Sequence, residues 1–166
     1  ALAELARLPG IDLPVMAAPE MKISMQLLMT AWAPAYIAGD GSLVALISAM
    51  MVRLSLEHGN TEASTYGYVT HAITAGSGLG DFKSGYEFGR LALAVNDKFH
   101  DLKLRAKAHH MFSCFVNFWR MPIKTCFPHS KDAFRSGLET GDFAYATYAA
   151  IHESWHAFFS GYELNQ

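Results

Sequence analysis

One helical hairpin, between Thr61 and Phe99, constrains the fold of this chain more than any other stretch. Apolar side chains recur at helical spacing from Thr61 to Ile73, and again from Phe82 onward. The glycines between these segments supply the backbone freedom that a helix end and a tight turn require, and Asp81 stands where an N-cap is expected. Nowhere do apolar and polar residues alternate as in a strand, so we predict an all-α fold.

Five further helices are expected along the chain. They run from Glu20 to about Pro34, from Leu43 to the stop at Gly59, from Leu102 to Trp119, across Pro128 to Gly141, and from Ala144 to Phe159. Helix starts recur at a spacing of roughly 40 residues, which is typical of helix pairs that stack into solenoids. The Gly-Asp-Phe turn at residues 80–82 also recurs at residues 141–143. We therefore predict stacked antiparallel helical hairpins, an α-solenoid fragment of about seven helices.

The chain divides into two unequal parts. Residues 1–18 hold Pro9, Gly10 and Pro14, and we expect a linker or a short helical lead-in there. Residues 19–166 are expected to form a single helical domain. Because the chain does not begin with Met, we expect it to be a piece excised from a longer protein.

Composition excludes several functions. Hydrophobic residues make up 51% of the chain and charged residues only 17%, so helices must be buried on more than one face. A net charge of -2 provides no field that would attract nucleic acid, and we expect none as a partner. The uncharged windows at 23–39 and 41–52 are separated by Asp40 and broken by Pro34, which favours core helices over membrane insertion.

The two cysteines lack the spacing of a secreted disulfide scaffold. We interpret Cys114 and Cys126 as free thiols in a reducing compartment. No signal peptide pattern precedes them, because prolines interrupt the apolar N-terminal stretch. A cytoplasmic location is therefore expected.

The sharpest chemical motif is His152-Glu153-Ser154-Trp155-His156, an H-E-x-x-H sequence on an expected helix. In zinc hydrolases this spacing gives two histidine ligands on one face and a glutamate base. Such a site needs a third protein ligand, for which the candidates are Glu163, His109, His110 and Glu139. His109 and His110 point in different directions on a helix, so at most one can ligate. We favour the simpler interpretation that His152 and His156 are packing residues.

Other candidate motifs lack the neighbouring residues that their possible functions require. The glycines at 76–80 follow no strand, and no Lys-Ser or Lys-Thr pair directly follows the last of them as in a Walker motif, so they predict a turn and not a phosphate loop. Cys114 has no neighbour that would activate its thiol, and the basic residues between Lys98 and Lys124 are interrupted by acidic ones, as on a solvated face. We therefore expect no catalytic residue, no metal site and no cofactor.

Several ordered strings resemble one helical region of very large signalling kinases. They are Pro34-Ala35-Tyr36, SLVALISAMMVRLSLEHGN, YGYVTHAITAGSGLGDFKSGYEFGRLAL, FVNFWRMPI and SGLETGDFAYATYA. In that family a serine/threonine kinase-like domain and a STAND-type ATPase precede this region, and GAF and histidine kinase domains follow it. The resemblance implies a TPR-like helical region, and it supplies no catalytic residue, since the phosphotransfer and ATP sites lie in other domains.

These observations together predict a non-catalytic interaction and relay module in a multidomain sensor kinase. It would couple a nucleotide-binding ATPase region to sensor and kinase output domains, with other domains of the same chain, and possible further signalling proteins, as partners. The last helix carries more aromatic residues than one core face can hold, and we expect some to cover a neighbouring repeat. The alternatives are a zinc-dependent hydrolase using His152, Glu153 and His156, or a small-molecule-sensing helical domain.

Overall fold

The structure is a computed structural model that describes residues 10–162. Across these residues every regular element is a helix, which confirms the all-α prediction. The seven α-helices of this range are α2 (Pro19–Ile37), α3 (Gly41–His58), α4 (Glu62–Ile73), α5 (Phe82–Phe99), α6 (Leu102–Met111), α7 (Cys126–Thr140) and α8 (Phe143–Phe159). Two π-helical turns, η1 (Thr74–Gly78) and η2 (Phe112–Val116), extend α4 and α6, and two 3₁₀ turns, η3 (Asn117–Trp119) and η4 (Ile123–Thr125), lead to α7.

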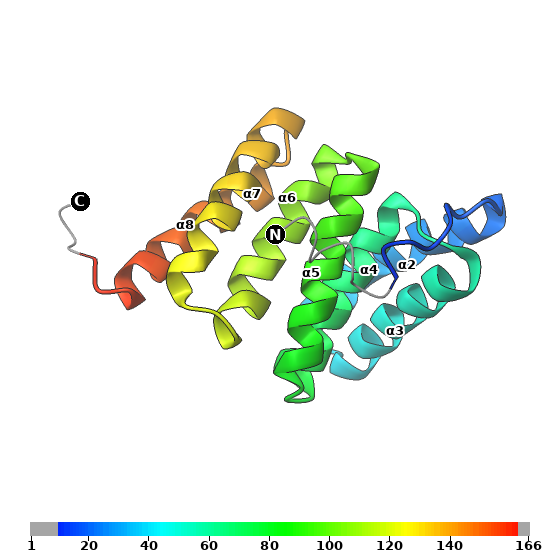
Figure 1. The fold of residues 1–166 in the computed structure, drawn as a ribbon, viewed down its shortest axis with the longest axis horizontal. Helices are drawn as coiled ribbons and strands as arrows, with labels where there is room; N and C mark the ends of the chain where they lie inside the picture. Colours follow the sequence, from blue (N-terminus) through cyan, green and yellow to red (C-terminus); the bar gives the residue numbers. More distant parts are fainter. Residues whose placement is uncertain (1–9, 163–166) are drawn as a thin grey trace.

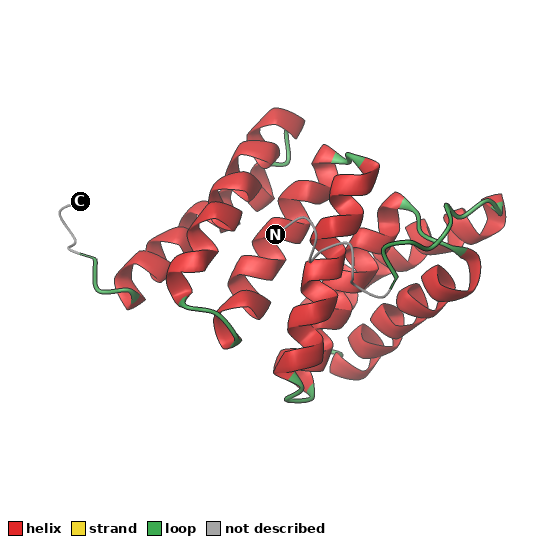
Figure 2. Cartoon of the chain, in the orientation of Figure 1, coloured by secondary structure: helices red, strands yellow, loops and turns green. Residues whose placement is uncertain are grey.

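The helices stand side by side in chain order. Figure 1 shows a row that begins with α2 and α3 at one end and finishes with α7 and α8 at the other. Each helix packs on its neighbour in sequence, and α6 also packs on α4, which joins the two halves of the row. Short loops connect them (Figure 2). This stacked arrangement agrees with the solenoid-like fold expected from the sequence.

Aspartate caps start four of the helices. The carboxylates of Asp40, Asp81 and Asp142 each accept a hydrogen bond from the backbone N–H three residues on, at 2.9, 3.0 and 3.3 Å. Asp101 accepts two such bonds, from Lys103 and Leu104. These bonds satisfy amides that the first helical turn leaves without partners. Asp81 and Asp142 confirm that the repeated Gly-Asp-Phe string marks a helix start.

Pro34 does not end the first helix, contrary to the sequence prediction. Helix α2 passes through Pro34 and continues to Ile37. A proline inside a helix costs about 3 kcal/mol because it removes one hydrogen bond and crowds the preceding turn. Here the flanking side chains of Trp32 and Ala35 are buried in the core, and the Trp32 indole donates to the Ser48 hydroxyl at 2.9 Å. Tertiary packing therefore outweighs the local penalty.

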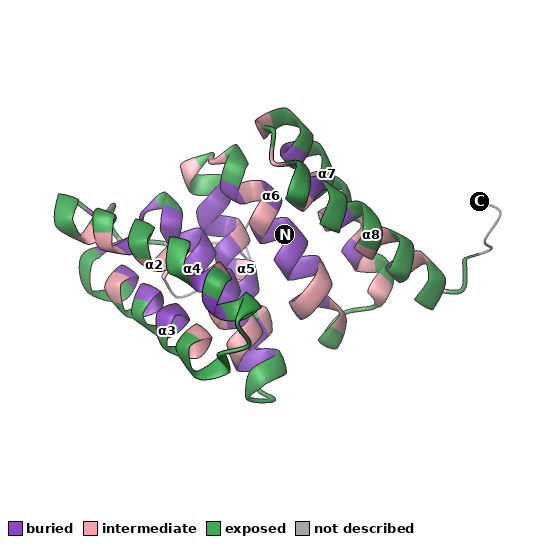
Figure 3. Cartoon of the chain, turned by 180° about the vertical axis from the view of Figure 1, so that it is seen from behind, coloured by how far each residue is buried: buried purple, intermediate pink, exposed green. Residues whose placement is uncertain are grey.

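Helix α4 is the centre of the core. Every residue from Ala63 to Thr70 is buried, which confirms that some helices are covered on more than one face (Figure 3). A Cβ atom on Gly85 of α5 would lie 2.8 Å from the Ala72 carbonyl oxygen, so this glycine lets two backbones approach closely. A Cβ on Gly89 would instead meet the Phe112 ring at 2.6 Å.

Residues 10–18 run extended along the corner between α3 and α4. The Met16 side chain is fully buried, and Val15 forms an isolated parallel bridge with Asn60. The Asn60 amide donates to the Gly10 carbonyl at 2.7 Å and its carbonyl oxygen accepts from the Tyr68 hydroxyl at 2.8 Å. This stretch is thus packed on the helices. Residues 1–9 of the expected lead-in lie outside the described residues.

The length and apolar character of the helices bear on the question of membrane insertion. Among residues 10–162, none of the helices combines the length and the apolar character needed to cross a bilayer.

Candidate functional site

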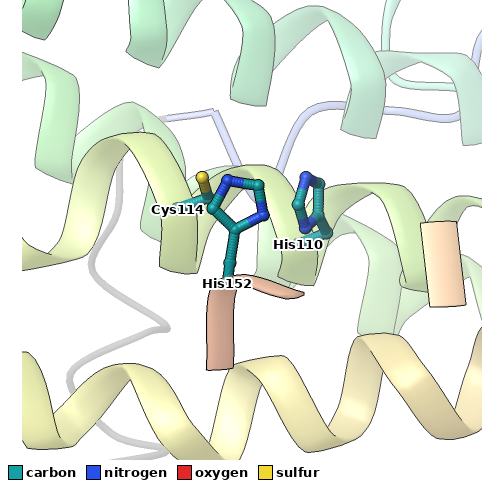
Figure 4. Close-up of side chains that lie close together, drawn as sticks. All are labelled: His110, Cys114 and His152. Carbon is teal, nitrogen blue, oxygen red and sulfur yellow. The ribbon is translucent and has the colours of Figure 1, made fainter. Parts of the chain in front are cut away.

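Three potential metal ligands meet between α6 and α8. His110 lies in α6, Cys114 in the π turn that follows it, and His152 in α8. Each offers one ligand atom, and these atoms all lie within 4.8 Å of one another. Figure 4 shows the three side chains pointing toward a common space between the two elements.

Local structure explains how these side chains come together. His110 and Cys114 are four residues apart, so they lie on one side of successive helical turns. Helix α8 packs closely on α7, where a Cβ on Gly137 would lie only 3.0 Å from the Ala146 side chain. Helix α7 also packs on α6, so α8 is held beside α6 and His152 meets the other two side chains.

The two histidines differ in their hydrogen bonding. The Nδ1 atom of His152 lies 2.8 Å from the Tyr148 carbonyl oxygen. A carbonyl can only accept, so Nδ1 is the donor, and in a neutral imidazole with this tautomer Nε2 is the nitrogen that carries a lone pair. The His110 side chain is nearly fully buried, with 4% of its residue surface exposed, and its Nδ1 atom has no hydrogen-bond partner.

Burial disfavours the charged forms of His110 and Cys114. It lowers the pKa of His110 to about 4, with smaller contributions from His152 and His156, because a charged imidazole is poorly solvated there. Burial also raises the pKa of the Cys114 thiol to about 12. A thiol with such a pKa is not an activated nucleophile, in agreement with the absence of an activating sequence neighbour. Both cysteines are free, as the sequence analysis expected.

An apolar cavity adjoins the cluster. It has a volume of about 380 Å³ and lies between α2, α4, α6 and α8. His110 and His152 form part of its wall, and aromatic and aliphatic side chains supply most of the rest: Trp32, Tyr36, Ile37, Ile73, Met111, Phe115, Tyr145 and Tyr148. A cavity of this size and character suits a small apolar ligand.

The H-E-x-x-H motif does not assemble as one group in the part of the chain that the structure describes. Glu153 lines a different cleft, with Phe127 and Lys131. His156 is buried, with its ring centroid 6.4 Å from that of Phe127. Neither residue belongs to a set of three ligand atoms within residues 10–162, whereas His152 does. Glu163, one candidate third ligand, lies outside the described residues.

The sequence analysis named His110 among the candidate third ligands for His152, but it did not identify Cys114 as a partner of the two histidines. The available signal was the spacing His110-x-x-x-Cys114, which places an imidazole and a thiol on one helical side. The contribution of His152, far along the chain, depends on tertiary packing. Of the other upstream candidates, Glu139 belongs to no such group among the described residues.

His109 faces away from this cluster, as its position next to His110 predicted. Its Nδ1 atom lies 3.3 Å from Nδ1 of His129, and burial lowers the pKa of both rings. They border a cleft of about 670 Å³ between α5, α6 and α7. In it, Arg105 forms ion pairs with Asp97 at 2.8 Å and Asp132 at 3.2 Å. These pairs neutralise Arg105, one of the basic residues between Lys98 and Lys124.

The protein is thus an all-helical domain of stacked hairpins, with a small cluster of potential metal ligands beside an apolar cavity. The chain is similar to the hybrid signal transduction histidine kinase G of Dictyostelium discoideum, with 23% identity over 135 residues. The match covers 80% of this chain and only 4% of that kinase. No family model and no solved structure matches the chain. The similarity supports a signalling-kinase context.

Proposed function

We propose that this chain is a non-catalytic interaction and relay module of a multidomain sensor kinase. It couples a nucleotide-binding ATPase region to sensor and kinase output domains in the same polypeptide. The observation that carries the proposal is the similarity to a hybrid histidine kinase along 80% of this chain. Because the match occupies 4% of that protein, the shared region corresponds to one small part of a much larger signalling polypeptide.

The distribution of exposed apolar side chains supports a role between two neighbours. At one end of the row, α2 and α3 expose Ile23, Leu27, Ile37, Leu46 and Leu56. At the opposite end, α8 exposes Phe143, Ile151, Trp155, Phe158 and Phe159 (Figures 1 and 3). Apolar patches on folded domains mark contact surfaces. Two such surfaces, separated by the whole row of helices, suit a module that contacts a different domain at each end.

The relay would be mechanical. Helix α6 packs on both α4 and α7, so a displacement at one end of the row has a continuous packed route to the other. A shift of α8 against α7 would alter the surface offered to an adjoining domain. Under this proposal the segment works in the cytoplasm, and its partners are other domains of its own polypeptide and further signalling proteins.

The test uses the intact polypeptide that contains this segment. The double variant Trp155→Glu, Phe159→Glu places charges on residues that are 57% and 71% exposed, so the fold should survive while the apolar contact is lost. We expect histidine autophosphorylation to lose its dependence on nucleotide at the ATPase region, while basal autophosphorylation remains. The matched control Thr147→Glu, Ser154→Glu adds equal charge to exposed polar positions of α8 and should retain the coupling. Coupling that is unchanged in the first variant would contradict the proposal.

The cavity of about 380 Å³ favours a second candidate function, the sensing of a small apolar molecule. Its wall is mainly aromatic and lies between elements from both halves of the row. Denatured protein would be extracted with organic solvent and the extract analysed by mass spectrometry. We expect an apolar compound to accompany the wild-type chain and to be missing from Ala33→Phe, which fills the cavity. Ala150→Phe, in the separate cleft near Glu153, is the control. Equal extracts from both variants would exclude this function.

A further inference from the structure

The cluster formed by His110, Cys114 and His152 has the donor set of a transition-metal site. Two imidazole nitrogens and one thiolate are borderline to soft ligands, which disfavours Mg²⁺ and Ca²⁺, since those ions prefer oxygen. Zinc binds such sets with nitrogen at about 2.0 to 2.1 Å and sulfur at about 2.3 Å in tetrahedral geometry. We propose that these three residues bind one Zn²⁺ ion, and that the metal ties α8 to α6.

The distances between the three ligand atoms are close to those of a tetrahedral zinc site. In a tetrahedral zinc site, neighbouring ligand atoms lie roughly 3.4 to 3.6 Å apart, as follows from the bond lengths above. Here the three ligand atoms lie within 4.8 Å of one another, so small side-chain rotations bring them to bonding distance. His110 and Cys114 come from adjacent turns of one element, which leaves His152 as the only ligand that must be supplied by a second helix.

Two structural features of His110 and His152 favour their binding of a metal ion. The Nδ1 atom of His152 lies 2.8 Å from the Tyr148 carbonyl oxygen, and this contact orients the ring and makes Nε2 the nitrogen available to a metal, as outer hydrogen bonds do in known zinc sites. The His110 ring is buried, yet its Nδ1 atom has no partner, and its centroid lies 5.1 Å from that of His152. Buried polar atoms are rarely left unpaired, so a metal supplies a reason for this one.

Three protein ligands leave a fourth coordination position open, and the apolar cavity that His110 and His152 border adjoins the cluster. A water molecule or a small ligand within the cavity can occupy that position. Glu153, the residue that a hydrolase of the H-E-x-x-H type uses as its base, lines a separate cleft. We therefore infer that the metal binds a small ligand and holds α8 in position, and that it does not catalyse hydrolysis. Zinc uptake releases the Cys114 thiol proton to solvent as the thiolate–zinc bond forms.

The experiment titrates the reduced, metal-free chain with Zn²⁺ in competition with a chromophoric chelator, and with Co²⁺ as a spectroscopic probe. We expect one metal ion per chain, visible absorption typical of tetrahedral cobalt, and a thiolate-to-cobalt charge-transfer band. Cys114→Ser should abolish that band, and Cys114→Ser and His152→Gln should each lower zinc affinity by at least about 100-fold, because loss of even an outer-shell partner costs 10- to 100-fold.

Matched controls separate this site from the H-E-x-x-H motif. His156→Gln, Glu153→Gln and Cys126→Ser remove a neighbouring histidine, the motif glutamate and the other free thiol, and each should retain the affinity and spectrum of the wild type. Circular dichroism checks that every variant is folded. Zinc should also slow amide exchange in α8 of the wild type and not in Cys114→Ser. Zinc affinity that survives Cys114→Ser, or the lack of stoichiometric binding by the wild-type chain, would overturn the assignment.

Discussion

Burial lowers the pKa of several histidines in this chain, and His71 in α4 is one that lies outside the proposed metal site. Its half-buried ring stands edge-on to Phe88 at a centroid distance of 4.6 Å, and its Nδ1 atom has no hydrogen-bond partner. Burial lowers the pKa of His71 in the folded state, because the charged ring would lose its hydration. The unfolded chain, in contrast, can protonate this side chain freely.

This difference predicts a pH dependence of stability. As the pH falls below the unfolded-state pKa of about 6.5, the unfolded chain gains a proton that the folded chain does not bind, so the free energy of unfolding decreases. We expect His71→Gln to lose less stability than the wild type between pH 7.5 and pH 5. Urea unfolding at a series of pH values measures this, and equal m-values would show that the denatured state is unchanged. Parallel pH profiles for the two chains would contradict the prediction.

At the scale of the helix, capping by aspartate sets where each element starts. Asp101 is the clearest case, since its carboxylate accepts bonds from two amides of α6 at 2.9 and 3.0 Å. Asp101→Ala removes both acceptors, and we expect a loss of about 0.5 to 2 kcal/mol in the free energy of unfolding. Asp101→Asn keeps a capping oxygen and should lose distinctly less. Thermal or urea unfolding that gives equal stability for the two variants would contradict a capping role.

Contact between helices depends on single glycines. A Cβ on Gly85 would lie 2.8 Å from the Ala72 carbonyl oxygen and 3.0 Å from the Gly76 nitrogen, and neither backbone atom can move independently of its helix. We expect Gly85→Ala to destabilise the fold by about 1 to 3 kcal/mol through overpacking. Gly41→Ala is the matched control, because nothing lies within 4 Å of the added atom. Urea unfolding that finds Gly85→Ala as stable as the control would show that α4 and α5 can separate without cost.

At the scale of the whole molecule, the core is concentrated in one part of the row. The main apolar cluster draws its fully buried residues from the segment between Met16 and Val116, with α4 at its centre. Helix α8 contributes only Ala146, Ala149 and His156 as buried side chains. Regions with few buried apolar contacts open more readily than the rest of a domain.

We therefore expect amide exchange to be slowest in α4 and fastest in α8 among the long helices. Hydrogen exchange followed by mass spectrometry measures this order directly. A strong chelator should be present throughout, so that a metal bound at His110, Cys114 and His152 does not protect α8. Equal protection of α4 and α8 under these conditions would mean that the row unfolds as a single cooperative unit.

Much of the fold was predictable from the sequence because its signals are local. Apolar spacing predicted the helices, and the aspartates and glycines between them predicted most of their boundaries, since capping involves only residues three or four apart. Pro34 was the exception, because Trp32 and Ala35 are held in the core by contacts with another helix. The glycine-rich break was also partly helical, with a π turn over Thr74–Gly78.

The candidate site was harder to predict from the sequence, because its residues lie far apart along the chain. His110 and Cys114 share a helical side that the sequence displays, but His152 lies on another helix and joins them only through the packing of α8 on α6 and α7. The same packing turns Glu153 toward a different cleft, so the motif most visible in the sequence is divided in space. The helices and their caps depend on residues close together in the chain, so they can be predicted from the sequence. Which side chains meet depends on how the helices pack, so it becomes known only from the tertiary structure.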